Sequence, residues 1–149
     1  MIHRNLTLEN CFLSPNGTVK IGNFAAAVSA SSEKSPTSAS TISTTTLPSH
    51  LASEYIAPEG RRNEWSSKSD IWSLGVCAWK LRIGKDTPLV KVATLATSPD
   101  QLSKSITASF RTPEKELVQG FLAQCLVVHP SERATAEELL RHPLGNDKR

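Results

Sequence analysis

The chain has 149 residues and a formal net charge of +3, which suits one compact domain and leaves little room for two. Its Lys and Arg residues are scattered, so the sequence does not support nucleic-acid binding. Three widely spaced cysteines without a C-x-x-C pair argue against a zinc site or a disulfide framework. No apolar run reaches about 18 residues and no signal-peptide core is present, so no membrane association is expected. We expect a cytoplasmic protein, with the nucleus and the cytoskeleton left open.

The first 28 residues are predicted to form a loop followed by a β-hairpin. Residues 11–13 are a short apolar run, and residues 18–21 alternate with β-branched side chains, as strands do. Between them stands Ser-Pro-Asn-Gly, in which Gly17 can adopt the positive φ of a tight turn.

The next segment, residues 29–49, is low in complexity. Ser or Thr occupies 13 of its 21 positions. Such a segment buries too little apolar surface to offset the entropy lost on ordering, so a mobile loop is expected.

The remainder, from residue 50, is predicted to be helical. One helix is expected to start at a cap on Ser69 or Asp70 and to run to about residue 83, with apolar residues nearly all round it, which favours a buried helix. A second helix begins near residues 113–114. A third spans residues 135–141 and opens with a capping box, Thr-x-x-Glu. The chain is therefore expected to be mainly α with a small β-hairpin.

Five motifs resemble those of protein kinases and keep their order over nearly the whole chain. Residues 3–10 (His-Arg-Asn-Leu-Thr-Leu-Glu-Asn) resemble the catalytic loop, H-R-D-L-x-x-x-N. Residues 23–25 (Asn-Phe-Ala) stand in the place of D-F-G, and residues 57–59 match A-P-E. The central buried helix and the closing helices of the family resemble residues 70–75, 125–133 and 137–143. The nearest kinds are Ser/Thr kinases of the NIMA-related or MAP-kinase-kinase type.

The resemblance implies that residues 1–149 form part of a kinase-like domain, a C-terminal lobe truncated at the catalytic loop. Residues 1–28 would be the catalytic-loop and hairpin region, residues 29–59 the activation segment, and residues 60–149 a helical subdomain. No Gly-rich loop, strand lysine or helix-αC glutamate is found. We therefore expect a fragment that exposes apolar surface and has marginal stability.

The catalytic positions that the resemblance implies are degenerate. Asn5 stands where the catalytic aspartate should be, and a neutral amide cannot act as a general base. Asn23 stands in place of the magnesium-binding aspartate of D-F-G and has lost its negative charge. Thr7 replaces the lysine that meets the γ-phosphate. Asn10 is retained as a vestigial metal and cofactor position, and Phe12 is bulky enough to fill the floor beneath the adenine ring.

The architectural positions, by contrast, match the family. Glu59 and Arg133 correspond to a buried ion pair that fastens the activation segment to the closing helices. Asp70 corresponds to a residue that accepts hydrogen bonds from the catalytic-loop backbone. His3 and Phe24 match members of an apolar stack.

These observations favour a catalytically inactive pseudokinase fragment that binds other proteins, such as a kinase or a signalling complex. Its surfaces would be the activation segment and residues 88–109, and Arg4 would pair with a phosphate on that segment, for instance at Ser35. No cofactor is expected for this chain. ATP and Mg²⁺ would be bound only if a full-length form retains binding. Two alternatives stay open: a divergent Ser/Thr kinase whose N-terminal lobe is missing, and a decaying paralogue without function.

Overall fold

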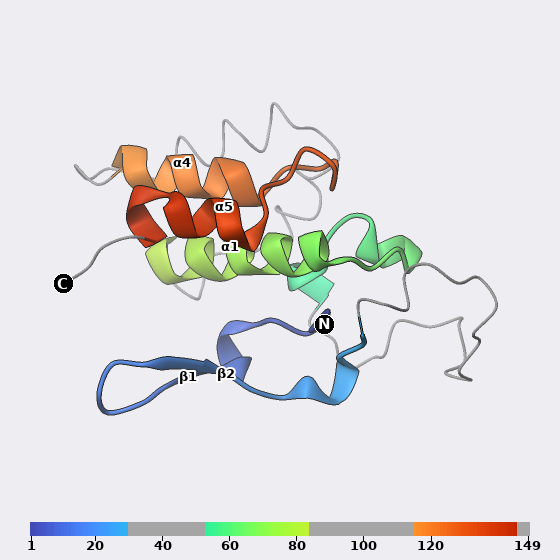
Figure 1. Cartoon of the computed structure of the whole chain (residues 1–149), viewed down its shortest axis with the longest axis horizontal. Helices are drawn as coiled ribbons and strands as arrows, with labels where there is room; N and C mark the ends of the chain where they lie inside the picture. Colours follow the sequence, from blue (N-terminus) through green and yellow to red (C-terminus); the bar gives the residue numbers. More distant parts are fainter. Residues whose placement is uncertain (30–52, 84–114, 146–149) are drawn as a thin grey trace.

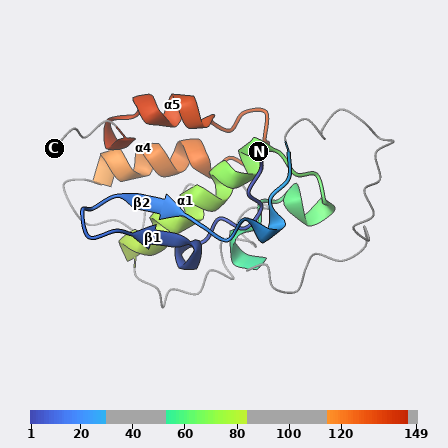
Figure 2. The same ribbon diagram turned by 60° about the horizontal axis from the view of Figure 1, so that its bottom comes forward.

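The computed structural model describes residues 1–29, 53–83 and 115–145, and it forms a small helical body with one two-stranded sheet (Figure 1). Helix α1 (Ser67–Ile83) lies between the hairpin and the helix pair α4 (Lys115–Cys125) and α5 (Ala136–Arg141) in Figure 1, and Figure 2 shows the hairpin crossing in front of α1. This agrees with the mainly α fold predicted with a small hairpin. The expected mobile loop and the proposed surface at residues 88–109 lie outside the described residues. Among the helices that are described, none is long and apolar enough to cross a bilayer.

Short 3-10 helices connect these elements. They are η1 (Leu8–Asn10), η2 (Phe24–Ala26), η4 (Ser53–Tyr55), η5 (Gly60–Arg62) and η6 (Pro143–Gly145). Three of them, η1, η2 and η4, shape the chain around the site described below.

The hairpin pairs β1 (Cys11–Leu13) with β2 (Val19–Ile21) in antiparallel register, with Leu13 opposite Val19. Its turn has the predicted chemistry: Gly17 adopts a φ of 82°, and the amide of Ser14 donates to the carbonyl of Thr18 over 2.9 Å. The second strand starts one residue later than expected. Large apolar side chains on both strands remain exposed, namely Phe12, Leu13, Val19 and Ile21.

The core lies where α1 meets α4 and α5. Trp72 and Val76 of α1 are buried with Leu122 of α4 and Leu139 of α5. Gly75 permits this approach, because a β-carbon there would stand 2.6 Å from the β-carbon of Cys125. The helix is therefore buried along most of its length, as its composition indicated.

Two details of α1 and α4 differ from the sequence prediction. Leu81, one of the apolar residues from which a buried helix was predicted, is 73% exposed. Leu117, counted in the apolar stripe of α4, is 44% exposed. Helical spacing identified the helices but did not show where neighbouring elements stop covering them.

The predicted start of α1 is wrong by three or four residues, because a cap at Ser69 or Asp70 would place the first helical residue at position 70 or 71. The helix begins at Ser67, so Ser69 and Asp70 lie inside its first turn. The hydroxyl of Ser69 donates to Oε1 of Glu59 over 2.9 Å and accepts from the amide of Ser66 over 3.1 Å. Both residues are good caps in isolation, but tertiary partners engage their side chains instead.

Helix α5 starts as predicted. Thr135 is its N-cap, and its hydroxyl accepts from the amide of Glu138 over 3.2 Å. The carboxylate of Glu138 accepts in return from the amide of Thr135 over 2.7 Å, which completes the capping box.

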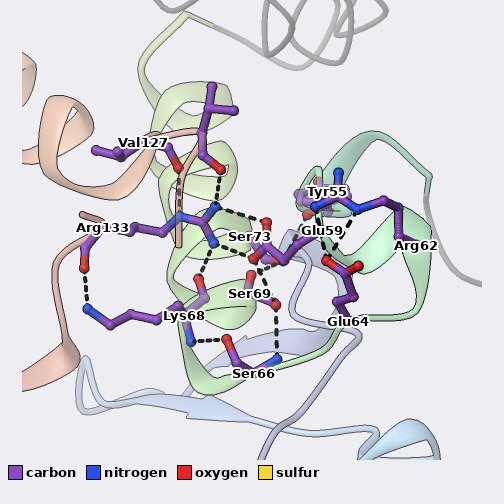
Figure 3. Close-up of polar contacts among 11 residues, drawn as sticks. Tyr55, Glu59, Arg62, Glu64, Ser66, Lys68, Ser69, Ser73, Val127 and Arg133 are labelled. Atoms are coloured by element: carbon purple, nitrogen blue, oxygen red, sulfur yellow. Dashed lines mark hydrogen bonds and ion pairs between the residues drawn. The ribbon is translucent and has the colours of Figure 1, made fainter. Parts of the chain in front are cut away.

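A buried ion pair joins the segment before α1 to the segment before α5 (Figure 3). Arg133 binds Glu59 through two hydrogen bonds, Nη1 to Oε1 over 2.6 Å and Nη2 to Oε2 over 3.0 Å. The guanidinium also donates to the carbonyls of Lys68 and Val127, and it lies 5.2 Å from the ring centroid of Trp72. Arg133 is 1% exposed, so both charges depend on these partners.

Replacing Arg133 with Met should destabilise the fold by about 3–5 kcal/mol, because Glu59 would be left as an unpaired buried charge. The free energy of unfolding, measured by urea denaturation and far-UV circular dichroism, tests this. The matched control is Arg62→Met, which breaks a 3.0 Å ion pair with Glu64 between two exposed side chains. The control should cause little change. Equal shifts of the midpoint in the two variants would contradict the structural role of Arg133.

The exposed hairpin predicts binding of a fluorescent apolar dye such as anilinonaphthalene sulfonate to the folded chain. Replacing Leu13 and Val19 together with Thr keeps β propensity and should lower dye fluorescence clearly. The control Leu81→Gln removes an isolated exposed side chain and should leave the signal nearly unchanged. Dye binding that is equal in both variants and the parent would show that the hairpin is not the apolar surface.

Candidate functional site

The candidate site is built on residues 3–10, and Asp70 holds this loop against α1. Its carboxylate accepts from the backbone amide of His3 (2.7 Å to Oδ2) and from that of Arg4 (2.9 Å to Oδ1). Arg4 adopts a φ of 63°, which turns the backbone so that both amides face the same carboxylate. Burial raises the pKa of Asp70, while the two backbone hydrogen bonds oppose that rise.

His3 lies beneath the following turn with both ring nitrogens engaged. Its Nε2 is 3.0 Å from the carbonyl of Gly22, and its Nδ1 accepts from the amide of Asn5 over 3.3 Å. A carbonyl only accepts, so Nε2 is the donor in the contact with Gly22. The ring meets Phe24 edge to face, with centroids 4.7 Å apart. The structure therefore brings together the two aromatic residues that the sequence assigned to one stack.

The three amide positions form one hydrogen-bonded chain. Nδ2 of Asn10 donates to the backbone carbonyl of Asn5 over 2.8 Å, and Nδ2 of Asn23 donates to Oδ1 of Asn10 over 3.1 Å. Asn5 and Asn10 are buried. Asn23 adopts a left-handed backbone conformation (φ 60°, ψ 61°), which asparagine tolerates better than most residues. The fold thus connects the three positions to which the family resemblance assigned the catalytic base and the metal ligands.

Thr7 and Phe12, the two other positions that the sequence singled out, differ in exposure. Thr7 is buried, and its carbonyl accepts from the amide of Asn10 over 3.2 Å. Phe12 is 56% exposed and lies against Gly22, where a β-carbon would come within 2.7 Å of its Cε2. The ring therefore covers a glycine on the hairpin and leaves more than half of its own surface open.

Arg4 connects the loop with two further segments. Its Nε donates to the carbonyl of Ala26 over 2.5 Å, and its guanidinium carbon lies 6.0 Å from the ring centroid of Trp65. Trp65 itself packs against Ala26 and Ile56 in a second small cluster. Burial lowers the pKa of Arg4, and Asp70 opposes that shift. Ser35, the proposed phosphate-bearing partner of Arg4, lies outside the described residues.

Sequence reasoning missed Trp65 and also a buried lysine beside η4. Lys80 forms an ion pair with Glu54, and its ammonium nitrogen lies 4.4 Å from the ring centroid of Tyr55. Near them, the hydroxyl of Tyr55 and the indole nitrogen of Trp79 are buried without a partner among the described residues. A lysine inside an apolar helical run was the available signal, because burial of a charge requires a partner.

The described residues contain no group of three or more His, Cys, Asp or Glu side chains that could hold a metal ion. The carboxylates of the site's surroundings, Asp70 and Glu59, are both committed to protein partners. Among the described residues, the site therefore presents neutral amides and backbone carbonyls rather than carboxylates.

Comparison with known proteins agrees with these motifs. The family model for the protein kinase domain matches residues 1–144. The chain is 31% identical over 143 residues to serine/threonine-protein kinase Nek3 of Oryza sativa subsp. japonica, covering 96% of this chain and 23% of that protein. It is 32% identical over 145 residues to the probable serine/threonine-protein kinase mkcD of Dictyostelium discoideum, covering 95% and 20%. The chain therefore spans about a fifth to a quarter of the length of these relatives.

A match over nearly the whole chain establishes the family. The chain belongs to the protein kinase domain family and is similar to Ser/Thr kinases that include the NIMA-related type.

Proposed function

We propose that this chain is a catalytically inactive member of the protein kinase family, a C-terminal-lobe module that works by binding other proteins. The observation that carries the proposal is that neutral asparagines occupy positions 5 and 23, where the Asn23 side chain donates to Oδ1 of Asn10 and Asn10 donates to the backbone carbonyl of Asn5. Kinase catalysis relies there on one aspartate that receives the substrate proton and another that holds magnesium.

The missing base is not replaced by a neighbouring group. Asn5 is neutral, and His3 uses Nδ1 to accept from the amide of Asn5 while Nε2 faces the carbonyl of Gly22. Asp70 spends both carboxylate oxygens on backbone amides of the loop. A general base needs a basic lone pair within reach of the substrate proton: the amide of Asn5 is not basic, and the contacts of His3 and Asp70 are made with the protein.

The residues also do not fit the magnesium ion that the family implies. Mg²⁺ favours anionic oxygens in near-octahedral geometry. Here Oδ1 of Asn10 already accepts from Asn23, and both residues are uncharged amides. Phosphoryl transfer that depends on this metal has no ligand set among the described residues, so we propose no cofactor for the chain.

The proposal that the chain binds other proteins is supported by its structural contacts and by its exposed apolar surface. The Glu59–Arg133 pair and the Asp70 contacts preserve the shape of the lobe without any catalytic group. An exposed apolar hairpin adds surface of the kind that protein partners cover. We propose a cytoplasmic protein partner, such as a kinase or another signalling protein, rather than nucleic acid or a membrane.

One observation favours the alternative of a divergent Ser/Thr kinase. Asn10 is retained, and both relatives named above carry the name of a serine/threonine kinase. On this alternative Asn10 would still act in phosphoryl transfer. Phosphoryl transfer would then depend on Asn10, and this dependence distinguishes a divergent kinase from an inactive binding module.

A transfer assay with radiolabelled ATP, Mg²⁺ or Mn²⁺, and a generic protein substrate tests the proposal on the protein purified from its own cells. We expect no transfer above that of the variant Asn10→Ala, because loss of the general base alone costs roughly 10²–10⁴ in rate. Equal residual counts in both samples would identify a contaminating kinase. Transfer by the parent that disappears in Asn10→Ala would establish the divergent kinase instead.

A further inference from the structure

We propose that the hydrogen bond between the side chains of Asn23 and Asn10 replaces a divalent cation as the link between these two segments. The site then keeps its geometry without metal and does not recruit one. This inference rests on the proposed non-catalytic function, since it describes how the same site is closed.

The orientation of each amide follows from its neighbours. The backbone carbonyl of Asn5 can only accept, so Nδ2 of Asn10 must face it, as it does at 2.8 Å. Oδ1 of Asn10 then points the other way and requires a donor. Asn23 supplies one through Nδ2 at 3.1 Å. Both ends of the Asn10 amide are therefore satisfied by the protein alone.

An aspartate at position 23 would remove the donor that Oδ1 of Asn10 has in the present structure. Its carboxylate has no proton to donate, so an acceptor would face Oδ1 of Asn10 at about the separation of the present hydrogen bond. Two acceptor oxygens at that distance repel each other, and a cation between them removes the repulsion. With an amide of the same shape in place of the carboxylate, the side chains at positions 23 and 10 therefore bind each other directly, without a cation between them.

The surrounding contacts show that this link closes a defined turn. The amide of Gly22 donates to the backbone carbonyl of Asn10 over 2.9 Å, directly beside the side-chain bond. Asn23 holds its left-handed conformation, and the next residue, Phe24, meets the ring of His3. The turn is thus tied to the loop at three consecutive residues.

The test compares the melting temperature of the whole chain in EDTA with that in excess Mn²⁺ or Mg²⁺. For the unchanged chain, the melting temperature should be the same in both conditions. Asn23→Asp should melt lower in EDTA, by roughly 2–4 °C for the loss of one such link in a chain of this size, and should recover when Mn²⁺ is added.

The matched control is Asn63→Asp. Asn63 is also left-handed, at a φ of 64°, and its Oδ1 accepts from the indole nitrogen of Trp65 over 3.0 Å, which an aspartate can continue to do. This variant adds the same charge in the same backbone conformation, so it should show no recovery with Mn²⁺. Binding of Mn²⁺, measured by electron paramagnetic resonance, should likewise appear only in Asn23→Asp.

Two results would overturn the inference. One is stoichiometric Mn²⁺ binding by the unchanged chain, and the other is an Asn23→Asp variant that behaves like Asn63→Asp in both conditions. Failure of the proposed function is seen separately: transfer that depends on Asn10, in a chain that binds no Mn²⁺, would refute catalytic inactivity and leave the amide link standing. Metal binding without transfer would refute the link alone.

Discussion

The bidentate contact between Arg133 and Glu59 is the constraint on which the rest of the structure depends. A guanidinium that is almost completely buried has five N–H groups, and each needs an acceptor. Glu59 supplies two carboxylate oxygens, and the carbonyls of Lys68, Val127 and Val128 supply the others. These acceptors belong to the segment before α1, the first turn of α1, and the connection between α4 and α5. The pair therefore fixes three separate stretches of chain relative to one another (Figure 3).

The position of the candidate site follows from that arrangement. With the start of α1 held in place, Asp70 stands where two consecutive amides of the loop can reach it. The loop in turn presents Asn5 and Asn10 to the turn that carries Asn23. Each of these contacts is a hydrogen bond between two groups of the protein itself. A shift of α1 would propagate to the amide chain through Asp70, although Arg133 touches none of the three amides.

The sequence predicted the elements with strong local signals and missed what depends on neighbours in space. The hairpin turn at Gly17 and the capping box of Thr135 are local, and both appear as predicted. The start of α1 was wrong because Ser69 is a good cap by type but is engaged by Glu59. Leu81 was placed inside because its spacing is helical, yet the core ends before it. Local sequence signals do not show which residues of a helix a neighbouring element covers.

The candidate site shows the same division. The motifs placed the three amides together, because their order in the chain resembles that of a known family. They did not show that the side chain of Asn23 donates to Asn10, since that requires the left-handed turn and the orientation set by the carbonyl of Asn5. Trp65 and Lys80 carry no motif, so only their burial and partners identify them.

The choice of amides at these positions has a physical explanation that goes beyond the loss of catalysis. Asparagine matches aspartate in shape, so the loop and the turn keep their packing while the negative charge is removed. A carboxylate at position 23 would repel Oδ1 of Asn10 unless a cation were bound between the two oxygens. If the site binds no cation, as we propose, that repulsion would only lower stability, and the asparagine at position 23 avoids it through its hydrogen bond to Asn10.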